Sequence, residues 1–205
     1  MPSEFIGTFI ERTHGDVFNL PNLLTWLRIL LIPVFVGVFY VSDAVMPGHY
    51  RNLTATLLFA LAAITDWLDG YLARAMGQTS AFGAFLDPVA DKLMVAAALV
   101  VLVEFGRVHA LIALIIIGRE ITISALREWM ARIGEHKSVA VSMVGKVKTG
   151  TQMAAILLLL YQDHIAFGLT GQWVGTVLIY LAAGLTLWSM LYYLKAAMPR
   201  ALSRP

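Results

Sequence analysis

Cysteine is absent from this chain of 205 residues, and charged residues make up only 14% of it. Without cysteine the protein can form neither disulfides nor thiolate metal sites. A soluble domain has about 25% charged and about 45–50% apolar residues, whereas this chain is 59% hydrophobic. The net charge of +2 is small, and the basic residues form no stripe that would bind nucleic acid. The composition therefore favours a membrane protein.

We also expect no secretory signal peptide, because the stretch MPSEFIGTFIERTHGD has no basic region followed by an apolar core and a cleavage site. Long apolar runs are present instead, and a membrane-spanning helix needs roughly 20 mainly apolar residues. Six runs qualify: Asn22–Val41, Leu53–Leu72, Phe82–Phe105, Val108–Met130, Met143–Tyr161 and Trp173–Leu194. The expected fold is an all-α integral membrane protein with six transmembrane helices.

Lysine and arginine are unevenly distributed over the ends of these runs. With a cytoplasmic N-terminus, only Arg51 and Arg107 lie at the non-cytoplasmic ends. Because cytoplasmic loops carry the excess of positive charge, we expect both termini in the cytoplasm, in a bacterial inner membrane. The expected parts are a juxtamembrane segment (1–18), a membrane domain (19–197) and a cytoplasmic tail (198–205). Glu4–Arg12 has helical apolar spacing, which fits a short interfacial helix or a frayed terminus equally well.

Four aspartates interrupt the apolar pattern in the stretch DWLDGYLARAMGQTSAFGAFLDPVADK, residues 66–92. A carboxylate at the centre of a membrane helix costs ~2.5–3.5 kcal/mol on insertion scales, so a group of them needs compensation. Asp66 and Asp69 share one helix face, and so do Asp87 and Asp91, because they are three and four positions apart. The short MGQTS turn makes the two helices antiparallel, so both pairs can converge at the cytoplasmic end. Carboxylate oxygens suit Mg²⁺ or Mn²⁺, so the pattern predicts a divalent metal site.

Glycines and an arginine accompany these aspartates. Gly70 follows Asp69, and Gly83 lies one turn before Asp87, where a missing side chain lets a ligand approach closely. Arg74 lies one turn after Gly70 and can make a bidentate contact to a phosphate oxygen. Metal ions and arginine neutralise charge in phosphoryl transfer, so the set suits a diphosphate substrate. A buried ion-pair network without chemistry is the competing interpretation.

The complete pattern, Asp66-x2-Asp69-Gly70-x2-Ala73-Arg74-x8-Gly83-x3-Asp87-x3-Asp91, resembles the signature of the CDP-alcohol phosphatidyltransferases. The resemblance implies a six-helix membrane enzyme, commonly a homodimer, that transfers a phosphatidyl group from CDP-diacylglycerol to an alcohol and releases CMP. It implies that the four aspartates bind two divalent ions, Mg²⁺ or Mn²⁺, and that Asp91 is the base that deprotonates the attacking hydroxyl. The residues expected to contact CDP-diacylglycerol are Asp66, Asp69, Gly70, Ala73, Arg74 and Gly83.

Polar residues at the start of the first apolar run are further candidates. Asn22 and Thr25 lie one turn apart, next to Pro21, and so fit an ordinary helix N-terminus. The family resemblance implies instead that they contact the nucleotide of CDP-diacylglycerol or its phosphates. Arg28 lies one turn deeper and is a candidate partner for an aspartate or a phosphate.

Three other stretches, NLPNLLTWLRILLIPVFV, REITISALREWMARIG and SMVGKVKTGTQMAAI, are similar to the phosphatidylglycerophosphate synthase branch of that family. The acceptor that this implies is sn-glycerol 3-phosphate, a small dianion that requires a basic pocket. Arg119 lies inside an apolar run, where an arginine is costly and usually faces a polar interior. Lys146 and Lys148 begin the fifth run and can complete a phosphate site, or simply anchor the helix, and Arg127 is a further candidate. Glu120 is expected to pair with a nearby cation.

Other functions stay open at this stage. Serine, inositol phosphate and phosphatidylglycerol are alternative acceptors. A membrane cation transporter also uses carboxylates, but such sites usually lie near the midplane between broken helices. Here the carboxylates cluster toward one face, and no prominent glycine or proline break interrupts two corresponding runs. A prenyltransferase also uses aspartates with Mg²⁺, but the spacing of the two aspartate pairs argues against it.

Overall fold

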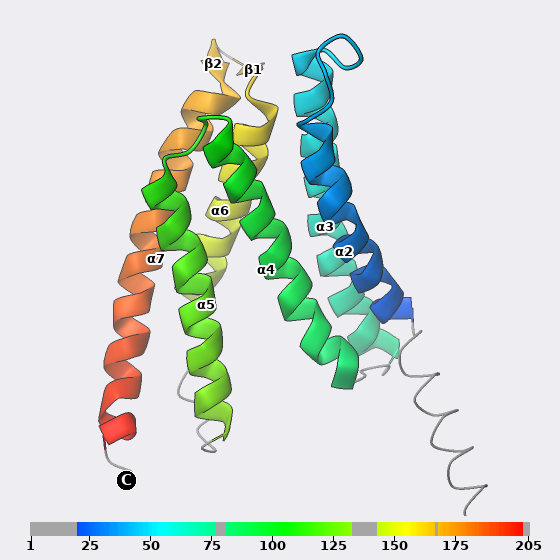
Figure 1. Ribbon diagram of the computed structural model, residues 1–205. Helices are drawn as coiled ribbons and strands as arrows, with labels where there is room; N and C mark the ends of the chain where they lie inside the picture. The colour runs from blue at the N-terminus through cyan, green and yellow to red at the C-terminus, as the bar shows by residue number, and fades with distance from the viewer. Residues whose placement is uncertain (1–19, 77–80, 133–142, 167, 203–205) are drawn as a thin grey trace, which may run out of the picture. The chain divides into compact units, whose positions relative to one another are not determined.

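The computed structural model describes the backbone of residues 20–76, 81–132, 143–166 and 168–202. Over these ranges it contains six helices and one two-stranded hairpin (Figure 1). The elements are α2 (Leu20–Val38), α3 (Gly48–Met76), α4 (Ala81–Glu104), α5 (Ala110–Arg132), α6 (Met143–Tyr161), β1 (His164–Ala166), β2 (Leu169–Thr170) and α7 (Gly171–Leu202). Each predicted apolar run therefore forms a helix. The segment Glu4–Arg12, expected as an interfacial helix, lies outside the described residues.

Contacts divide the chain into two compact units, with the boundary along the sequence between Ala98 and Leu99. In the first unit α2 packs against α3. The Phe35 ring lies 5.7 Å from that of Phe39 and 6.3 Å from that of Phe59, measured between centroids, and all three side chains are buried. Such aromatic contacts add to the burial of apolar area, so this cluster joins α2 to α3.

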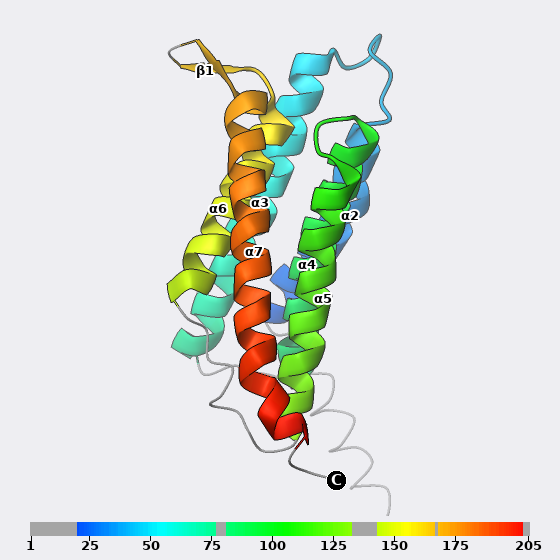
Figure 2. The ribbon, with the colours of Figure 1, turned by 90° about the vertical axis from the view of Figure 1, so that its left-hand side faces the viewer.

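In the second unit α7 packs against both α5 and α6 (Figure 2). The hairpin of β1 and β2 reverses the chain after α6, which makes α6 and α7 antiparallel neighbours. At its turn Gly168 has φ +75°, a conformation that glycine adopts without a steric cost. Strands this short leave little periodicity in a sequence, so the stretch QDHIAFGLTGQ by itself gives no sign of them.

The packing of α6 against α7 depends on two glycines. A Cβ on Gly171 would lie 2.6 Å from the carbonyl oxygen of Leu158, and a Cβ on Gly175 would lie 2.7 Å from Cγ of Leu159. Real Cβ atoms do not approach other atoms so closely. The missing side chains therefore allow the two backbones to come together, as small residues do at helix interfaces in membranes.

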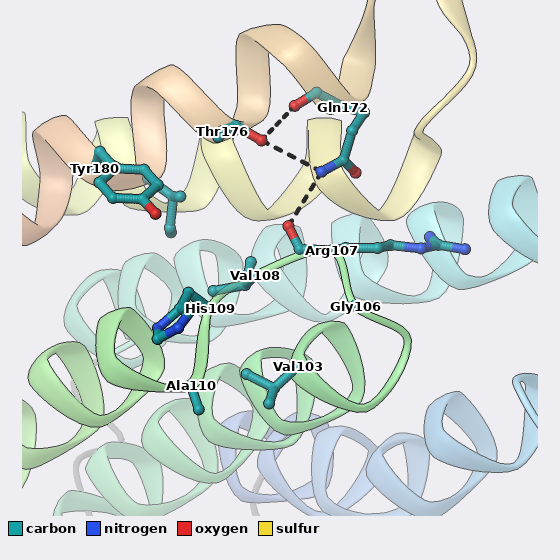
Figure 3. Close-up of a pocket in the computed structure, with 10 residues that line it drawn as sticks. Val103, Gly106, Arg107, Val108, His109, Ala110, Gln172, Thr176 and Tyr180 are labelled. Atoms are coloured by element: carbon teal, nitrogen blue, oxygen red, sulfur yellow. Dashed lines mark hydrogen bonds between the residues drawn. The ribbon is translucent and has the colours of Figure 1, made fainter.

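The turn between α4 and α5 is fixed to the hairpin end of the second unit. Arg107 donates through Nη1 to the carbonyl oxygens of Leu159 and Leu160, at 3.2 and 3.0 Å, and so caps the C-terminus of α6. Gln172 donates through Nε2 to the Arg107 carbonyl at 3.1 Å and to Thr176 Oγ1 at 3.3 Å. A cavity of about 480 Å³ lies between this turn and the first turns of α7 (Figure 3).

Among the described residues, only Gly171–Leu191 is both long and apolar enough to cross a membrane by its hydropathy. Asn22–Val38 and Val147–Tyr161 are apolar but shorter, and α3, α4 and α5 carry charged residues along their length. Large apolar side chains are nevertheless exposed on every helix, from Leu30 in α2 to Leu191 in α7. Extensive exposed apolar surface is unusual for a soluble monomer. The all-α class with six helices is confirmed, and six membrane spans stay a prediction.

Candidate active site

The aspartates of the motif lie on two consecutive helices of the first unit. Asp66 and Asp69 belong to the C-terminal half of α3, and Asp87 and Asp91 to the N-terminal half of α4. The carboxylates of Asp66 and Asp87 are close enough to repel each other. Asp66 of the first pair is therefore near Asp87 of the second pair. The side chain of Asp69 lies outside the described residues.

Helix α2 supplies a partner for each of these two carboxylates. Arg28 donates through Nη1 to Oδ1 of Asp66 at 2.7 Å, and the Thr25 hydroxyl donates to Oδ1 of Asp87. The Arg28 side chain is 1% exposed and that of Asp66 is 43% exposed, so the cation is buried and the carboxylate is partly open. Thr25 is fully buried. An aspartate or a phosphate was expected as the partner of Arg28, and in the structure that partner is Asp66.

The other residues expected to contact CDP-diacylglycerol are described to different extents. Asn22, at the start of α2, is buried, and Gly83 in α4 is also buried. For Gly70, Ala73 and Arg74 the structure describes the helical backbone of α3 but not the side-chain environment. Their expected contact with the nucleotide lipid stays a prediction.

The donor chemistry on α3 and α4 fits a hard divalent cation. Asp66 and Asp87 present carboxylate oxygens, the ligands that Mg²⁺ and Mn²⁺ prefer. Their mutual repulsion is a cost that a cation between them would remove. The described side chains, which do not include Asp69, contain no group of three acids or histidines that could hold a metal ion. A site built from all four aspartates is therefore a proposal, taken up below.

A second group of charged residues lies within the second unit, and we call it the α5–α6 ion cluster: Arg119, Glu120 and Lys148. Oε1 of Glu120 accepts from Arg119 Nη1 at 3.0 Å and from Lys148 Nζ. Arg119 also donates through Nη2 to the hydroxyl of Ser189 in α7, at 3.3 Å. The expected pairing of Glu120 with a nearby cation is confirmed, since it pairs with two.

Two further basic candidates belong to the same unit. Arg127 lies two turns beyond Arg119 on α5, is exposed, and is close enough to Lys148 for their charges to repel. Lys146 lies in the first turn of α6, but its side chain is not described. Arg119 and Arg127 are thus each within electrostatic range of Lys148.

Sequence reasoning missed the polar residues of α7 and the third turn of α6. Ser189 and Thr186 are buried and one turn apart, and the Ser189 hydroxyl donates to the Thr186 carbonyl at 2.9 Å. Gln152 is also buried, one turn after Lys148. Their sequence signal is weak, because isolated Ser, Thr and Gln are common in apolar helices. Helical spacing from the lysine would have indicated Gln152 as a residue on the same face.

The sequence matches a known family over most of its length. The profile of the CDP-alcohol phosphatidyltransferases covers residues 18–188. Proteins named CDP-diacylglycerol–glycerol-3-phosphate 3-phosphatidyltransferase from Shigella flexneri serotype 5b (strain 8401) and Salmonella typhimurium (strain LT2) are 52% identical to this chain over 184 residues. The protein of that name from Escherichia coli (strain K12) is 51% identical. Each match covers 88% of this chain and 95% of the relative.

Proposed function

The chain belongs to the CDP-alcohol phosphatidyltransferase family, and from this premise we propose that it transfers the phosphatidyl group of CDP-diacylglycerol to sn-glycerol 3-phosphate. The products are phosphatidylglycerophosphate and CMP. The observation that carries the proposal is the 51–52% sequence identity with enterobacterial proteins named CDP-diacylglycerol–glycerol-3-phosphate 3-phosphatidyltransferase, along nearly their whole length. The acidic residues of α3 and α4 and the α5–α6 ion cluster supply chemistry that suits a diphosphate donor and an anionic acceptor.

The reaction is an in-line displacement at phosphorus. The C1 hydroxyl of glycerol 3-phosphate gives its proton to Asp91, and its oxygen forms a bond to the β-phosphorus of CDP-diacylglycerol. The bond from that phosphorus to the bridging oxygen breaks, and CMP leaves. Asp91 suits the part of general base because it lies one turn after Asp87 on the same face of α4.

Divalent ions belong to the proposal, and Asp66, Asp69, Asp87 and Asp91 are the residues that would hold two of them. When bound, Mg²⁺ or Mn²⁺ polarises the diphosphate and neutralises the charge that develops on it. Thr25 and Arg28 fix the carboxylates of Asp87 and Asp66 from α2. The remaining donor-site residues would contact CDP-diacylglycerol: Asn22, Gly70, Ala73, Arg74 and Gly83.

The acceptor's phosphate would be bound by basic residues of the second unit: Arg119, Arg127, Lys146 and Lys148. Arg119 and Lys148 support this assignment best, because each is almost completely buried and charged. An arginine or lysine inside an apolar helix usually faces a polar interior and serves a site. We further propose six membrane spans, with both termini and the active site on the cytoplasmic side of a bacterial inner membrane, and a homodimer.

The direct test is turnover by the purified protein. Incubation with CDP-diacylglycerol, Mg²⁺ or Mn²⁺, and labelled glycerol 3-phosphate should give lipid-soluble label and an equal amount of CMP. Serine, inositol phosphate and phosphatidylglycerol in parallel should give little product. Folded protein that releases CMP only with one of those acceptors would retain the family and refute the acceptor. Folded protein that forms no lipid product with any acceptor would refute the activity.

A further inference from the structure

The carboxylate of Glu120 lies between the two buried cations of the α5–α6 ion cluster. One oxygen, Oε1, accepts from Arg119 and from Lys148, which belong to different helices. The Arg119 and Lys148 side chains are 5% and 1% exposed, whereas that of Glu120 is 28% exposed. The two cations are therefore inside the unit, and the carboxylate that joins them is its most open member.

The ion cluster has an excess of positive charge. Arg119 and Lys148 each carry one positive charge and Glu120 carries one negative charge, so the group is net positive. A buried charge without a counter-ion is costly. Nε of Arg119 is also buried without a hydrogen-bond partner among the described residues, which leaves one donor of the guanidinium unused. Surplus charge and an unused donor are what an anion with several acceptor oxygens would satisfy.

We infer that Glu120 is a positioning residue for the acceptor's phosphate. By accepting from both cations with one oxygen, it holds the guanidinium of Arg119 and the ammonium of Lys148 together as a two-cation anion site. This inference rests on the proposed function, because the anion would be the phosphate of sn-glycerol 3-phosphate. Glu120 does not itself contact the phosphate favourably, since both are anionic, and it acts through its two partners.

The guanidinium of Arg119 is also held by a hydrogen bond to α7. Its Nη2 donates to Ser189, whose hydroxyl donates in turn to the Thr186 carbonyl of α7. Lys148, in contrast, has Glu120 as its hydrogen-bonding carboxylate partner. Loss of the Glu120 charge would therefore disturb Lys148 most. Two buried cations without a shared counter-ion repel each other, and the flexible lysine is the one that can move away.

The first experiment compares Glu120→Gln with wild type in purified enzyme supplied with Mn²⁺. Glutamine keeps the size and one acceptor oxygen but removes the charge. We expect the KM for glycerol 3-phosphate to rise at least about tenfold and the KM for CDP-diacylglycerol to change less than about twofold. Glu120→Asp, which keeps the charge, should recover part of the loss. The matched control is Glu128→Gln, an exposed site on the same helix, which should behave as wild type.

Two kinetic results would overturn the inference. A lower KM for glycerol 3-phosphate in Glu120→Gln would mean that the carboxylate merely competes with the phosphate for the cations. Equal losses for both substrates, with a lower melting temperature, would mean a purely structural role. A double-mutant cycle with Lys148→Met adds a third criterion. If Glu120 acts through Lys148, Glu120→Gln should add less than about a twofold change in the Lys148→Met background, and fully multiplicative effects would contradict the coupling.

Ligand-induced thermal stabilisation separates this inference from the proposed function. Saturating glycerol 3-phosphate should raise the melting temperature of wild type and of Glu128→Gln, but raise that of Glu120→Gln much less. Wild type that binds and uses glycerol 3-phosphate, with Glu120→Gln stabilised equally, would overturn the role of Glu120 alone. Wild type that neither binds nor uses it would overturn the proposed acceptor, and the inference with it.

Discussion

At the scale of single residues, α2 contributes the two side chains that hold the acidic pair in place. The Thr25 hydroxyl donates to Asp87, and Arg28 pairs with Asp66. Both donors are buried, so water cannot readily replace the carboxylate as their hydrogen-bond acceptor. The carboxylates are thereby oriented before any cation or substrate binds.

Replacement of Thr25 by valine should separate this orientation from simple packing. Valine keeps the shape but removes a hydrogen bond to a charged group, which is worth about 1.5–3 kcal/mol. We expect turnover to fall on the order of 10- to 100-fold and the Mn²⁺ concentration for half-maximal activity to rise. Thr25→Ser keeps the hydroxyl and should stay near wild type in the same Mn²⁺ titration. Equal activity of the two variants would show that the hydroxyl has no part in positioning Asp87.

Asp91 carries the proton transfer in the proposed reaction. Asp91→Asn removes the base with little change of volume, so turnover should fall by about 10²- to 10⁴-fold, the usual contribution of such a group. Because Asp91 is also a proposed metal ligand, binding of CDP-diacylglycerol, followed by its effect on the melting temperature, should persist in part. Substantial turnover in Asp91→Asn would assign the base to another group.

At the scale of helices, the interface of α6 and α7 leaves no room for a side chain at Gly175. A Cβ on Gly175 would lie 2.7 Å from Leu159 Cγ, 3.0 Å from its backbone nitrogen and 3.1 Å from the Ala155 carbonyl oxygen. Backbone atoms cannot move aside as a flexible side chain can. The spacing of α7 and α6 therefore depends on glycine at this position.

Gly175→Ala should destabilise the protein because the added methyl overpacks this interface, which typically costs about 1–3 kcal/mol. The control is Gly184→Ala on the same helix, where nothing lies within 4 Å of the added Cβ. Thermal unfolding in detergent should give a melting temperature several degrees lower for Gly175→Ala and no decrease for Gly184→Ala. Equal values would mean that α6 and α7 do not approach as closely as described.

At the scale of the whole molecule, dependence on divalent ions is the strongest requirement of the proposed mechanism. Four aspartates near one diphosphate would repel it unless cations intervene. Excess EDTA should abolish turnover, and added Mg²⁺ or Mn²⁺ should restore it with the protein still folded. Full activity in the presence of a chelator would refute a metal-assisted transfer.

The membrane orientation can be read from single cysteines, because the natural chain has none. The positive-inside rule predicts that the connector between α2 and α3 lies outside the cytoplasm and the C-terminus inside. Ser42→Cys should react with a membrane-impermeant maleimide in intact spheroplasts, whereas Ser203→Cys should react only after permeabilisation. The reverse pattern would invert the orientation and place the active site on the wrong side for a cytoplasmic nucleotide lipid.

The sequence by itself determined the helices, the faces that carry the aspartates and the family, because apolar length, helical spacing and a fixed motif are local properties of the chain. Tertiary structure alone decided which residues meet: Thr25 with Asp87, Arg28 with Asp66, and Glu120 with both Arg119 and Lys148. Spacing shows which side chains share a face, but the rotation and depth of a neighbouring helix decide what that face contacts. For the same reason Ser189, an ordinary residue in an apolar run, became visible as a partner of Arg119 only once α7 was packed against α5.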